Sequence, residues 1–403
     1  MKAVVLAAGE GKRLKPLTAK TPKPLLPVAG KPLLLHILDA LKNAGIEEIA
    51  IVVHQQEAQF REMLEGKEGI TLIRQEKQAG TGDAVKTVRK FCDGNFLCLN
   101  GDIVFEEEIL KEVLAKGKGG KNVLAAVRRE NTLEYGAIEF DGEDVVKIHE
   151  KAKVKGDYIN AGIYYFTPEI FEALDKIKVS ARGEYELTDA INLLASEKKV
   201  VSVKSAGAWE DIGKPWDLLK ANEILLSKVQ RKILGEVEEY AVVKGNVVIE
   251  EGTVVHSGSY IVGPVYIGKN CRIGPNAYIR PSTYIGDNCH IGNASEIKNS
   301  IIMSNSNAPH FNYVGDSIIG MRVNLGAGTK IANLRLDGKE IHSYVQGVKV
   351  QTGLRKFGAV IGDDCKLGIN CSVNPGTVLS EECWVGAGRA VEARCYSPKT
   401  RII

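Results

Sequence analysis

Hydrophobic residues in the first half of the chain follow two alternating patterns. Short apolar runs typical of buried strands cover residues 2–7, 46–54, 70–75 and 95–100. Between them, residues 32–44, 57–64 and 81–91 have the spacing of amphipathic helices. This alternation predicts an α/β fold, in which helices cover a parallel sheet. Strand and turn signals dominate residues 135–166, where Asp141-Gly142 predicts a hairpin in an antiparallel, substrate-binding addition.

A different period governs the second half, where an aliphatic residue recurs at every sixth position. The first series comprises Val243, Ile249, Val255, Ile261, Ile267, Ile273, Ile279, Ile285, Ile291 and Ile297. The register breaks near residues 303–309, restarts at Ile319, Leu325 and Ile331, and resumes from Ile361 to Val391. This period is typical of a parallel β-helix whose coils stack equivalent apolar residues, and the glycine that often follows would permit tight corners. The change of period predicts two domains, residues 1–230 and 231–403.

Composition excludes several classes of protein. The 403 residues are 44% hydrophobic and 26% charged, which is ordinary for a globular protein. The formal net charge of +3 is spread among interspersed residues of both signs, so nucleic acid is not an expected partner. No run of about 20 apolar residues predicts a membrane span. The chain opens directly with a strand that a cleaved signal peptide would destroy, and we therefore expect a cytoplasmic protein.

The eight cysteines include no C-x-x-C pair and lie mostly at intervals set by the six-residue repeat. This spacing argues against a zinc site or a compact disulfide framework and favours a reducing compartment. A disulfide between Cys383 and Cys395 stays open as an alternative, because intracellular disulfides occur in thermophiles.

The first strand runs into a glycine loop, Ala8-Gly9-Glu10-Gly11-Lys12-Arg13, which continues through Pro16 and Thr18 to Pro22-Lys23-Pro24. Such a turn lets backbone N–H groups approach a triphosphate, while Arg13 and Lys23 supply fixed positive charge. The joint pattern G-x-G-x-R-x-x-P-x-T with P-K-P resembles the sugar-1-phosphate nucleotidylyltransferases. The resemblance implies a Rossmann-like domain in which Arg13 and Lys23 hold the triphosphate and stabilise the transition state. Lys12 departs from the threonine that is commoner in the family.

Further motifs extend the resemblance to the base and the metal. The amide of Gln75 suits a uracil or thymine edge, and Gly80 and Thr81 would line the base and ribose. Asp102 ends an apolar strand at the edge where parallel sheets place their ligands. Asp211 lies in Trp209-Glu210-Asp211, which resembles the W-x-D element of the thymidylyl branch. The family's use of this element implies that Asp102 and Asp211 hold Mg²⁺.

The family match also implies where the sugar binds. Matching positions are Tyr135, Gly136, Glu150, Asn160 and Glu184, the last within Arg182-Gly183-Glu184-Tyr185. In the family, such backbone glycines, carboxylates and asparagines bind sugar hydroxyls, and an N-acetyl group where the sugar carries one.

The repeats resemble the hexapeptide-repeat acyltransferases, which implies a left-handed parallel β-helix. Arg280 and Lys298 follow apolar residues at matching corners of consecutive coils, where two cations can clamp a phosphate. The elements His310-Phe311-Asn312-Tyr313 and Asn324-Leu325-Gly326-Ala327 resemble those of the bacterial bifunctional enzyme that acetylates and uridylylates glucosamine 1-phosphate. His310 is the candidate base for the amine proton, because a neutral histidine is common at pH 7. The remaining candidates for this site are Tyr313, Asn324, Ala327 and Asn333.

A loop over residues 332–355 interrupts the repeat and contains Lys339. Gly358 occupies the position where the bacterial enzyme has a second functional lysine, and Lys339 is the candidate substitute. In the family, this loop reaches a neighbouring subunit of a trimer.

We therefore expect a bifunctional enzyme. Its C-terminal domain would acetylate glucosamine 1-phosphate, or its galacto epimer, with acetyl-CoA. Its N-terminal domain would transfer UMP or dTMP from UTP or dTTP to N-acetylglucosamine 1-phosphate or glucose 1-phosphate, releasing pyrophosphate. The resemblance implies a homotrimer or a dimer of trimers.

Two alternatives stay open. In the first, a glucose-1-phosphate thymidylyl- or uridylyltransferase uses its β-helix only for oligomerisation or regulation. In the second, the chain is a non-enzymatic regulatory subunit, although Arg13, Lys23, Asp102 and Asp211 are all present. The sequence leaves the choice between UTP and dTTP, and between the sugars, undecided.

Overall fold

The computed structural model describes residues 1–129, 135–150 and 156–403. These residues form two compact units. The first unit comprises Met1–Glu10, Lys23–Leu25 and Leu33–Asp211, and the second comprises Gly11–Pro22, Leu26–Pro32 and Ile212–Ile403. The domain boundary at residue 230 stays a prediction.

The first unit is built on a mixed nine-stranded sheet in the order β5-β4-β1-β6-β11-β8-β12-β10-β9. In this order the strands are Ile70–Arg74, Glu48–Val53, Lys2–Leu6, Phe96–Asn100, Tyr158–Phe166, Asn122–Arg128, Val200–Ser205, Asp144–Glu150 and Gly136–Asp141. The strands β5, β4, β1 and β6 pair in parallel, whereas β11 runs antiparallel to both β6 and β8. The predicted hairpin is confirmed, since β9 and β10 pair antiparallel on either side of Gly142.

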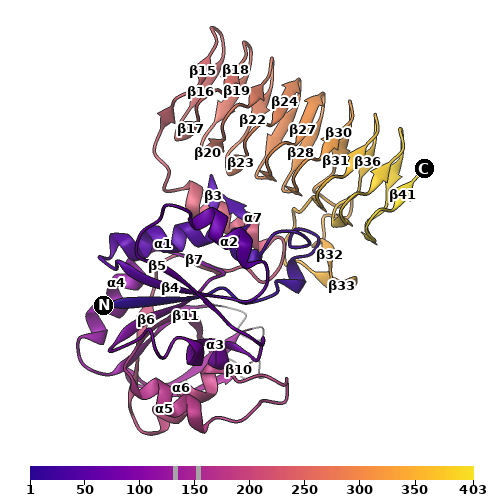
Figure 1. The fold of residues 1–403 in the computed structure, drawn as a ribbon. Coiled ribbons are helices and arrows are strands. Elements are labelled where there is room, and N and C mark those ends of the chain that lie inside the picture. The colour runs from indigo at the N-terminus through magenta and orange to yellow at the C-terminus, as the bar shows by residue number, and fades with distance from the viewer. Residues whose placement is uncertain (130–134, 151–155) are drawn as a thin grey trace. The chain divides into compact units, whose positions relative to one another are not determined.

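Helices cover both faces of this sheet, as the alternating pattern predicted. Figure 1 shows α1, α2 and α4 on one side and α3, α5 and α6 on the other. Their bounds are Leu33–Asn43, Glu57–Leu64, Glu107–Gly117, Thr81–Thr87, Glu169–Lys176 and Leu187–Ser196, respectively. Each face buries its own apolar core, and β1 contributes to both because alternate strand residues face opposite sides: Ala3 and Val5 to one, Val4 to the other. Every helix in the described ranges is too short or too polar to span a lipid bilayer.

A separate two-stranded sheet in the first unit carries Asp211, one of the predicted metal ligands. Strand β13 (Trp209–Asp211) runs antiparallel to β7 (Ile103–Phe105), with Asp211 opposite Ile103.

The second unit contains helix α7 (Asp217–Leu226), the short ladder β2 (Pro27–Val28) and β3 (Lys31–Pro32), and the predicted left-handed parallel β-helix. Three parallel sheets form its faces. The first comprises β14 (Lys232–Ile233), β17 (Val247–Ile249), β20 (Val265–Ile267), β23 (Thr283–Ile285), β26 (Ile301–Ile302), β29 (Ile318–Ile319), β34 (Ala359–Ile361), β37 (Thr377–Leu379) and β40 (Cys395–Tyr396). The second comprises β15 (Glu236–Val237), β18 (Val254–Val255), β21 (Arg272–Ile273), β24 (His290–Asn293), β27 (Asn307–His310), β30 (Asn324–Leu325), β35 (Lys366–Leu367), β38 (Trp384–Val385) and β41 (Arg401–Ile402). The third comprises β16 (Val242–Lys244), β19 (Tyr260–Val262), β22 (Tyr278–Ile279), β25 (Glu296–Lys298), β28 (Tyr313–Gly315), β31 (Lys330–Ile331), β36 (Ser372–Val373) and β39 (Ala390–Val391).

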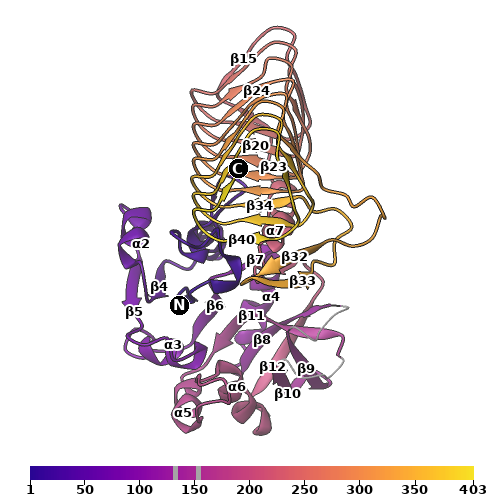
Figure 2. The same cartoon turned by 90° about the vertical axis from the view of Figure 1, so that its right-hand side faces the viewer.

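Equivalent strands of successive coils lie in register, as Figure 2 shows for β20, β23, β34 and β40. The aliphatic residues of the repeat all point inwards and form one continuous core. Cys383 lies in this core, whereas Cys395 pairs with Val378 outside it, and both are free thiols, so no disulfide joins them.

The six-residue register does break before residues 303–309, as predicted, but the coils themselves are continuous there. Ile279 pairs with Ile297 eighteen residues later, whereas Ile285 pairs with Ile302 only seventeen residues later. One corner is a residue shorter, so the inward positions continue at Ile302, Ala308 and Val314. A second short corner precedes Ile319. The later break is real, since residues 332–358 form an insertion that contains the hairpin β32 (His342–Val345) and β33 (Val348–Gln351).

The role predicted for the repeat glycines also needs correction. Most of them do not adopt the left-handed conformation that tight corners require, and asparagines such as Asn270 and Asn288 take it instead. At Gly292, a Cβ atom would lie 1.8 Å from the carbonyl oxygen of Pro309 in the next coil. These glycines therefore allow one coil to approach the next.

We predict that Gly292→Ala lowers the free energy of unfolding by about 1–3 kcal/mol, as overpacking does in other cores. The matched control is Gly386→Ala, because Gly386 holds the same repeat position near the last coil and its Cβ would meet nothing closer than 3.4 Å. Denaturant unfolding of both variants checks this, and equal losses would contradict it.

Candidate active sites

The glycine loop divides between the two units. In the first unit, Ala8 and Gly9 follow the carboxyl end of β1, and Gln78 Nε2 donates to the Ala8 carbonyl oxygen at 2.6 Å. In the second unit, Gly11 adopts φ 63° before the short helix η1 (Lys12–Leu14), and the Thr18 hydroxyl donates to the Gly11 carbonyl oxygen at 2.8 Å. The threonine of the motif therefore braces the turn, and the Arg13 side chain on η1 is exposed.

Lys23 and Asp102 lie together in the first unit, although 79 residues separate them in sequence. Lys23 lies in the short helix η2 (Lys23–Leu25) and is 7% exposed, and its Nζ is 2.5 Å from Asp102 Oδ2. The ladder of β13 and β7 places Asp211 opposite Ile103, next to Asp102 in the chain. The backbone thus brings both predicted metal ligands to one end of β6.

These two carboxylates form a donor set that suits a hard divalent cation. Mg²⁺ is usually held by one or two carboxylates, with phosphate and water oxygens completing the octahedron. Across the described ranges, no group of three or more His, Cys, Asp and Glu side chains is arranged around a metal position. Two carboxylates leave most of an octahedral shell to phosphate and water oxygens.

Gln75 is 2% exposed and its amide nitrogen is engaged within its own loop. Nε2 donates to the Gly80 carbonyl oxygen at 3.1 Å and to Asp83 Oδ2 at 2.8 Å. Only Oε1 of this amide is left for another partner. Reading of a pyrimidine by Gln75 stays a prediction, and the contacts show that Gln75 shapes the turn at Gly80.

That turn is joined to the segment predicted to bind sugar. Gly82 N donates to the Tyr185 carbonyl oxygen at 2.8 Å, and Tyr185 N donates to the Ala79 carbonyl oxygen at 2.7 Å. The Thr81 hydroxyl accepts from Leu187 N at 3.1 Å. Gly80 has φ 105°, and a Cβ there would lie 2.5 Å from the Tyr185 carbonyl oxygen, so no other residue fits. Glu184 lies beside this turn.

The structure brings three of the predicted sugar-binding residues together. A Cβ on Gly136 would lie 3.4 Å from Glu150 Oε1 and 3.8 Å from the Cβ of Asn160. Tyr135 lies nearby against Trp209, with ring centroids 6.1 Å apart. Arg182, which begins the run expected to bind sugar, has its guanidinium 3.7 Å from Glu150 Oε2.

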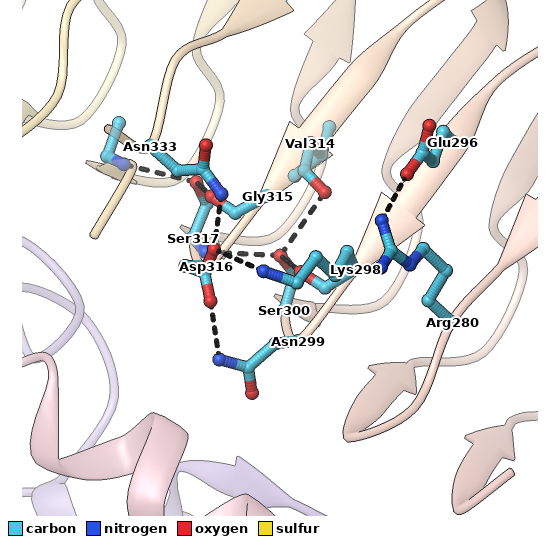
Figure 3. Close-up of polar contacts among 11 residues, drawn as sticks. Arg280, Glu296, Lys298, Asn299, Ser300, Val314, Gly315, Asp316, Ser317 and Asn333 are labelled. Atoms are coloured by element: carbon cyan, nitrogen blue, oxygen red, sulfur yellow. Dashed lines mark hydrogen bonds and ion pairs between the residues drawn. The ribbon is translucent and has the colours of Figure 1, made fainter. Parts of the chain in front are cut away.

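In the β-helix, the structure gathers Arg280, Lys298 and Asn333 around the corner that joins the third sheet to the first (Figure 3). The Tyr313 hydroxyl lies beside Asn333. The prediction that Arg280 and Lys298 occupy matching corners of consecutive coils is confirmed, since Ile279 pairs with Ile297. Each cation has an acidic partner. Arg280 Nη1 is 2.8 Å from Glu296 Oε1, and Lys298 Nζ is 3.2 Å from Asp316 Oδ2. A bound phosphate would compete with these carboxylates.

Tyr313 and Asn333 meet above Gly315. A Cβ at Gly315 would lie 2.6 Å from the Tyr313 hydroxyl oxygen and 2.7 Å from Asn333 Nδ2, so the glycine makes room for both groups. Burial raises the pKa of Tyr313, and the negative charges of Glu296 and Asp316 raise it further. The phenol therefore keeps its proton at neutral pH.

The remaining predicted residues lie elsewhere on the β-helix. His310 and Asn324 are exposed on β27 and β30 of the second sheet, and Ala327 follows at the next corner. Among the described residues, no hydrogen bond joins the His310 ring to the Tyr313 and Asn333 pair. Lys339 is exposed on the insertion, where its backbone N–H donates to Asp337 Oδ1 at 3.2 Å. One chain by itself therefore holds these groups at two separate corners.

Hydrogen bonds join the insertion to later coils of its own β-helix. Ser343 Oγ donates to the Gly376 carbonyl oxygen at 3.0 Å, and the Tyr344 hydroxyl donates to the Ala393 carbonyl oxygen at 2.9 Å. At its end, a Cβ on Gly358 would lie 2.0 Å from Ser317 Oγ and 2.4 Å from the Gly315 carbonyl oxygen. The backbone packing there leaves no room for a lysine side chain.

Comparison with known families agrees with a nucleotidyltransferase domain followed by a repeat domain. The nucleotidyl transferase family model matches residues 2–228, which is more than half of the chain. Models of the GMPPB C-terminal domain and of the hexapeptide repeat of succinyl-transferase match residues 261–355 and 358–393.

Similar proteins match along nearly the whole chain. The bifunctional protein GlmU of Methanocaldococcus jannaschii is 42% identical over 394 residues, covering 97% of this chain and 95% of the relative. The bifunctional sugar-1-phosphate nucleotidylyltransferase/acetyltransferase of Sulfurisphaera tokodaii is 41% identical over 396 residues, covering 97% of each chain.

A solved structure from Bacillus anthracis, described as a glucose-1-phosphate thymidylyltransferase, is 27% identical with a TM-score of 0.53, covering 56% of this chain and 95% of its own.

We predict that Glu296→Gln lowers the pKa of Tyr313 toward the usual value of about 10. The substitution removes a negative charge that raises this pKa and frees the Arg280 charge, which lowers it. NMR titration of ring-labelled tyrosine, with Tyr313→Phe to assign the signal, measures the shift. A pKa that rises in the variant would contradict the assigned cause.

Proposed function

The chain belongs to the family of bifunctional sugar-1-phosphate nucleotidylyltransferase/acetyltransferases, and we propose from this premise that it acetylates an amino-sugar 1-phosphate and transfers a nucleotidyl group to a sugar 1-phosphate. The observation that carries the proposal is that one chain holds both sets of groups. Lys23 pairs with Asp102 at the end of a parallel strand, and strand pairing brings Asp211 opposite the next residue, Ile103. Lys298 and the Tyr313–Asn333 pair lie together at a corner of the β-helix.

In the first reaction, the amine of glucosamine 1-phosphate, or its galacto epimer, attacks the thioester carbonyl of acetyl-CoA. A C–N bond forms, the C–S bond breaks, and coenzyme A leaves as a thiol. His310 takes the proton that the amine loses, as a neutral imidazole can at pH 7. Arg280 and Lys298 hold the sugar phosphate, and Tyr313 and Asn324 orient the sugar phosphate or the collapsing intermediate. Asn333 lies beside Tyr313 in this site, and the backbone around Ala327 accepts acetyl-CoA.

In the second reaction, a phosphate oxygen of N-acetylglucosamine 1-phosphate or glucose 1-phosphate attacks the α-phosphorus of UTP or dTTP. A new P–O bond forms, the bond to the β-phosphate bridge breaks, and pyrophosphate leaves. Arg13 and Lys23 neutralise the charge on the transferring group, and Gly11 lets the loop backbone approach the phosphates. Asp102 and Asp211 would hold Mg²⁺, which supplies further charge neutralisation when bound.

The substrates are positioned by the remaining residues of the first unit. Tyr135, Gly136, Glu150, Asn160 and Glu184 surround the sugar. Gly80 and Thr81 line the base and ribose beside Gln75, whose free Oε1 can accept from the imide N–H that uracil and thymine share. Both UTP and dTTP present that group.

We propose that the acetyltransferase sites form between subunits of a homotrimer or a dimer of trimers. His310 and the Tyr313–Asn333 pair lie at different corners of one β-helix, so a neighbouring chain is needed to complete a site. Lys339 on the exposed insertion would then act across the interface.

The test supplies the purified protein with glucosamine 1-phosphate and acetyl-CoA and follows the release of free thiol. Each triphosphate is then added with Mg²⁺, and pyrophosphate is measured. The rival keeps the nucleotidyl transfer but uses the β-helix only for oligomerisation or regulation. Pyrophosphate without thiol release would establish that rival.

We predict that Asp102→Asn and Asp211→Asn each slow pyrophosphate release by about 100-fold or more, because a weakened metal site removes several kcal/mol of transition-state stabilisation. Thiol release should stay at the wild-type rate, since the two reactions use different groups. Undiminished pyrophosphate release in the double variant would refute the metal assignment.

We predict the opposite pattern for His310→Ala. Thiol release should fall about 100- to 10,000-fold, the usual contribution of a general base, while pyrophosphate release from N-acetylglucosamine 1-phosphate is unchanged. The matched control is His290→Ala on the neighbouring coil. If thiol release survives the loss of His310, another group is the base.

A further inference from the structure

Asp316 lies at the centre of three stacked corners of the β-helix. Its backbone N–H donates to the Lys298 carbonyl oxygen of the preceding coil at 2.9 Å, and its carbonyl oxygen accepts from Gly358 N of the next coil at 2.8 Å. The residue is 4% exposed and has φ 50°. Its carboxylate is therefore buried and held from both sides by the main chain.

Three side chains donate to this one carboxylate (Figure 3). Lys298 Nζ lies 3.2 Å from Oδ2, Asn299 Nδ2 lies 2.7 Å from Oδ1, and Asn333 Nδ2 also bonds to Oδ2. An ionised carboxylate accepts hydrogen bonds and cannot donate them. Asn333 must therefore turn its amide nitrogen toward Asp316 and its oxygen, Oδ1, away from it.

The orientation of Asn333 sets that of Tyr313. The Asn333 amide nitrogen and the Tyr313 hydroxyl oxygen converge above Gly315, lying 2.7 and 2.6 Å from the same point, which places the amide to hydrogen-bond to the phenol. An amide nitrogen only donates, so the Tyr313 oxygen accepts this bond. The proton of the phenol then points elsewhere, and it is retained because burial raises the pKa of Tyr313.

We propose that Asp316 is a positioning residue that fixes the hydrogen-bond polarity of the acetyltransferase site, an inference that rests on the proposed function. Through Asn333 it makes Tyr313 a donor and Asn333 Oδ1 an acceptor toward the amino-sugar phosphate, and it holds the Lys298 ammonium beside them. Asp316 is buried beneath these groups and does not touch the substrate itself.

The first test is Asp316→Asn, which keeps the shape but replaces one carboxylate oxygen with an NH₂ group. The NH₂ group must face one of the three side-chain donors. The pattern in which all three donate to residue 316 is therefore lost. We expect kcat/KM for glucosamine 1-phosphate to fall about 10- to 100-fold, as when a hydrogen bond to a charged group is lost. KM for acetyl-CoA and the rate of pyrophosphate release should not change.

Asn299→Ala is the matched control, because Asn299 donates to Oδ1 of the same carboxylate and leaves the Asn333 bond on Oδ2 intact. We expect a loss of thermal stability with acetyl transfer close to wild type. If Asn299→Ala and Asp316→Asn lose activity in proportion to their loss of stability, Asp316 is only structural and the proposal fails.

A double variant that exchanges the hydrogen-bond donor and acceptor between positions 316 and 333 keeps the test decisive even where single variants fold poorly. In the double variant D316N/N333D, a hydrogen bond between the two positions can form again, but the donor now lies on residue 316. We expect the melting temperature to recover toward wild type while kcat/KM for glucosamine 1-phosphate stays low. Recovery of both would falsify the polarity argument.

The outcomes for the wild-type protein separate this inference from the function on which it rests. If the wild type releases no thiol, the proposed acetyltransferase function fails. If the wild type is active and Asp316→Asn matches it, only the role of Asp316 fails.

Discussion

The in-register pairing of successive coils is the constraint on which the β-helix and its site depend. Each short strand bonds through its backbone to the coil before and the coil after, so a residue gained or lost must be absorbed at a corner. Two consecutive coils lose one residue each at the corner between the third and first sheets, and the third coil extrudes its insertion there. The resulting stack aligns Lys298, Asp316 and Asn333 on neighbouring coils. The polar cluster thus follows from the backbone spacing.

Carboxylates accompany the cations in both candidate sites. Lys23 is paired with Asp102, Arg280 with Glu296, and Lys298 with Asp316. A buried cation without a partner would cost several kcal/mol, so these pairs let the positive charge lie close to the core. A phosphate that binds there meets cations already held in place, and it must compete for them with the carboxylates. We infer that these carboxylates lower the affinity of the two sites for phosphate but hold the cations in position before phosphate binds.

The sequence was informative wherever a local pattern carries the fold. Alternating strand and helix patterns and the six-residue period identify the two architectures, because burial of one face imposes a regular spacing on any such element. Hairpin β9–β10 was readable at Asp141-Gly142 for a different reason, because glycine readily adopts the left-handed turn conformation, here φ 62°. The signature loop was recognisable because phosphate binding requires glycines and cations at fixed offsets, and the family matches agree with that interpretation.

What the tertiary structure alone decided are the contacts that no local spacing encodes. A five-residue step from Ile297 to Ile302 breaks the period, and only the strand pairing shows that the coils continue through it. Gln75 turned inward, Gly358 proved too crowded for a lysine, and Asp316 emerged as the shared partner of three side chains. The convergence of Asp102 and Asp211 required the pairing of β7 with β13 across more than 100 residues. Periodicity reports which residues are buried, whereas the partners of a buried polar group are set by the register between strands, which a single sequence does not contain.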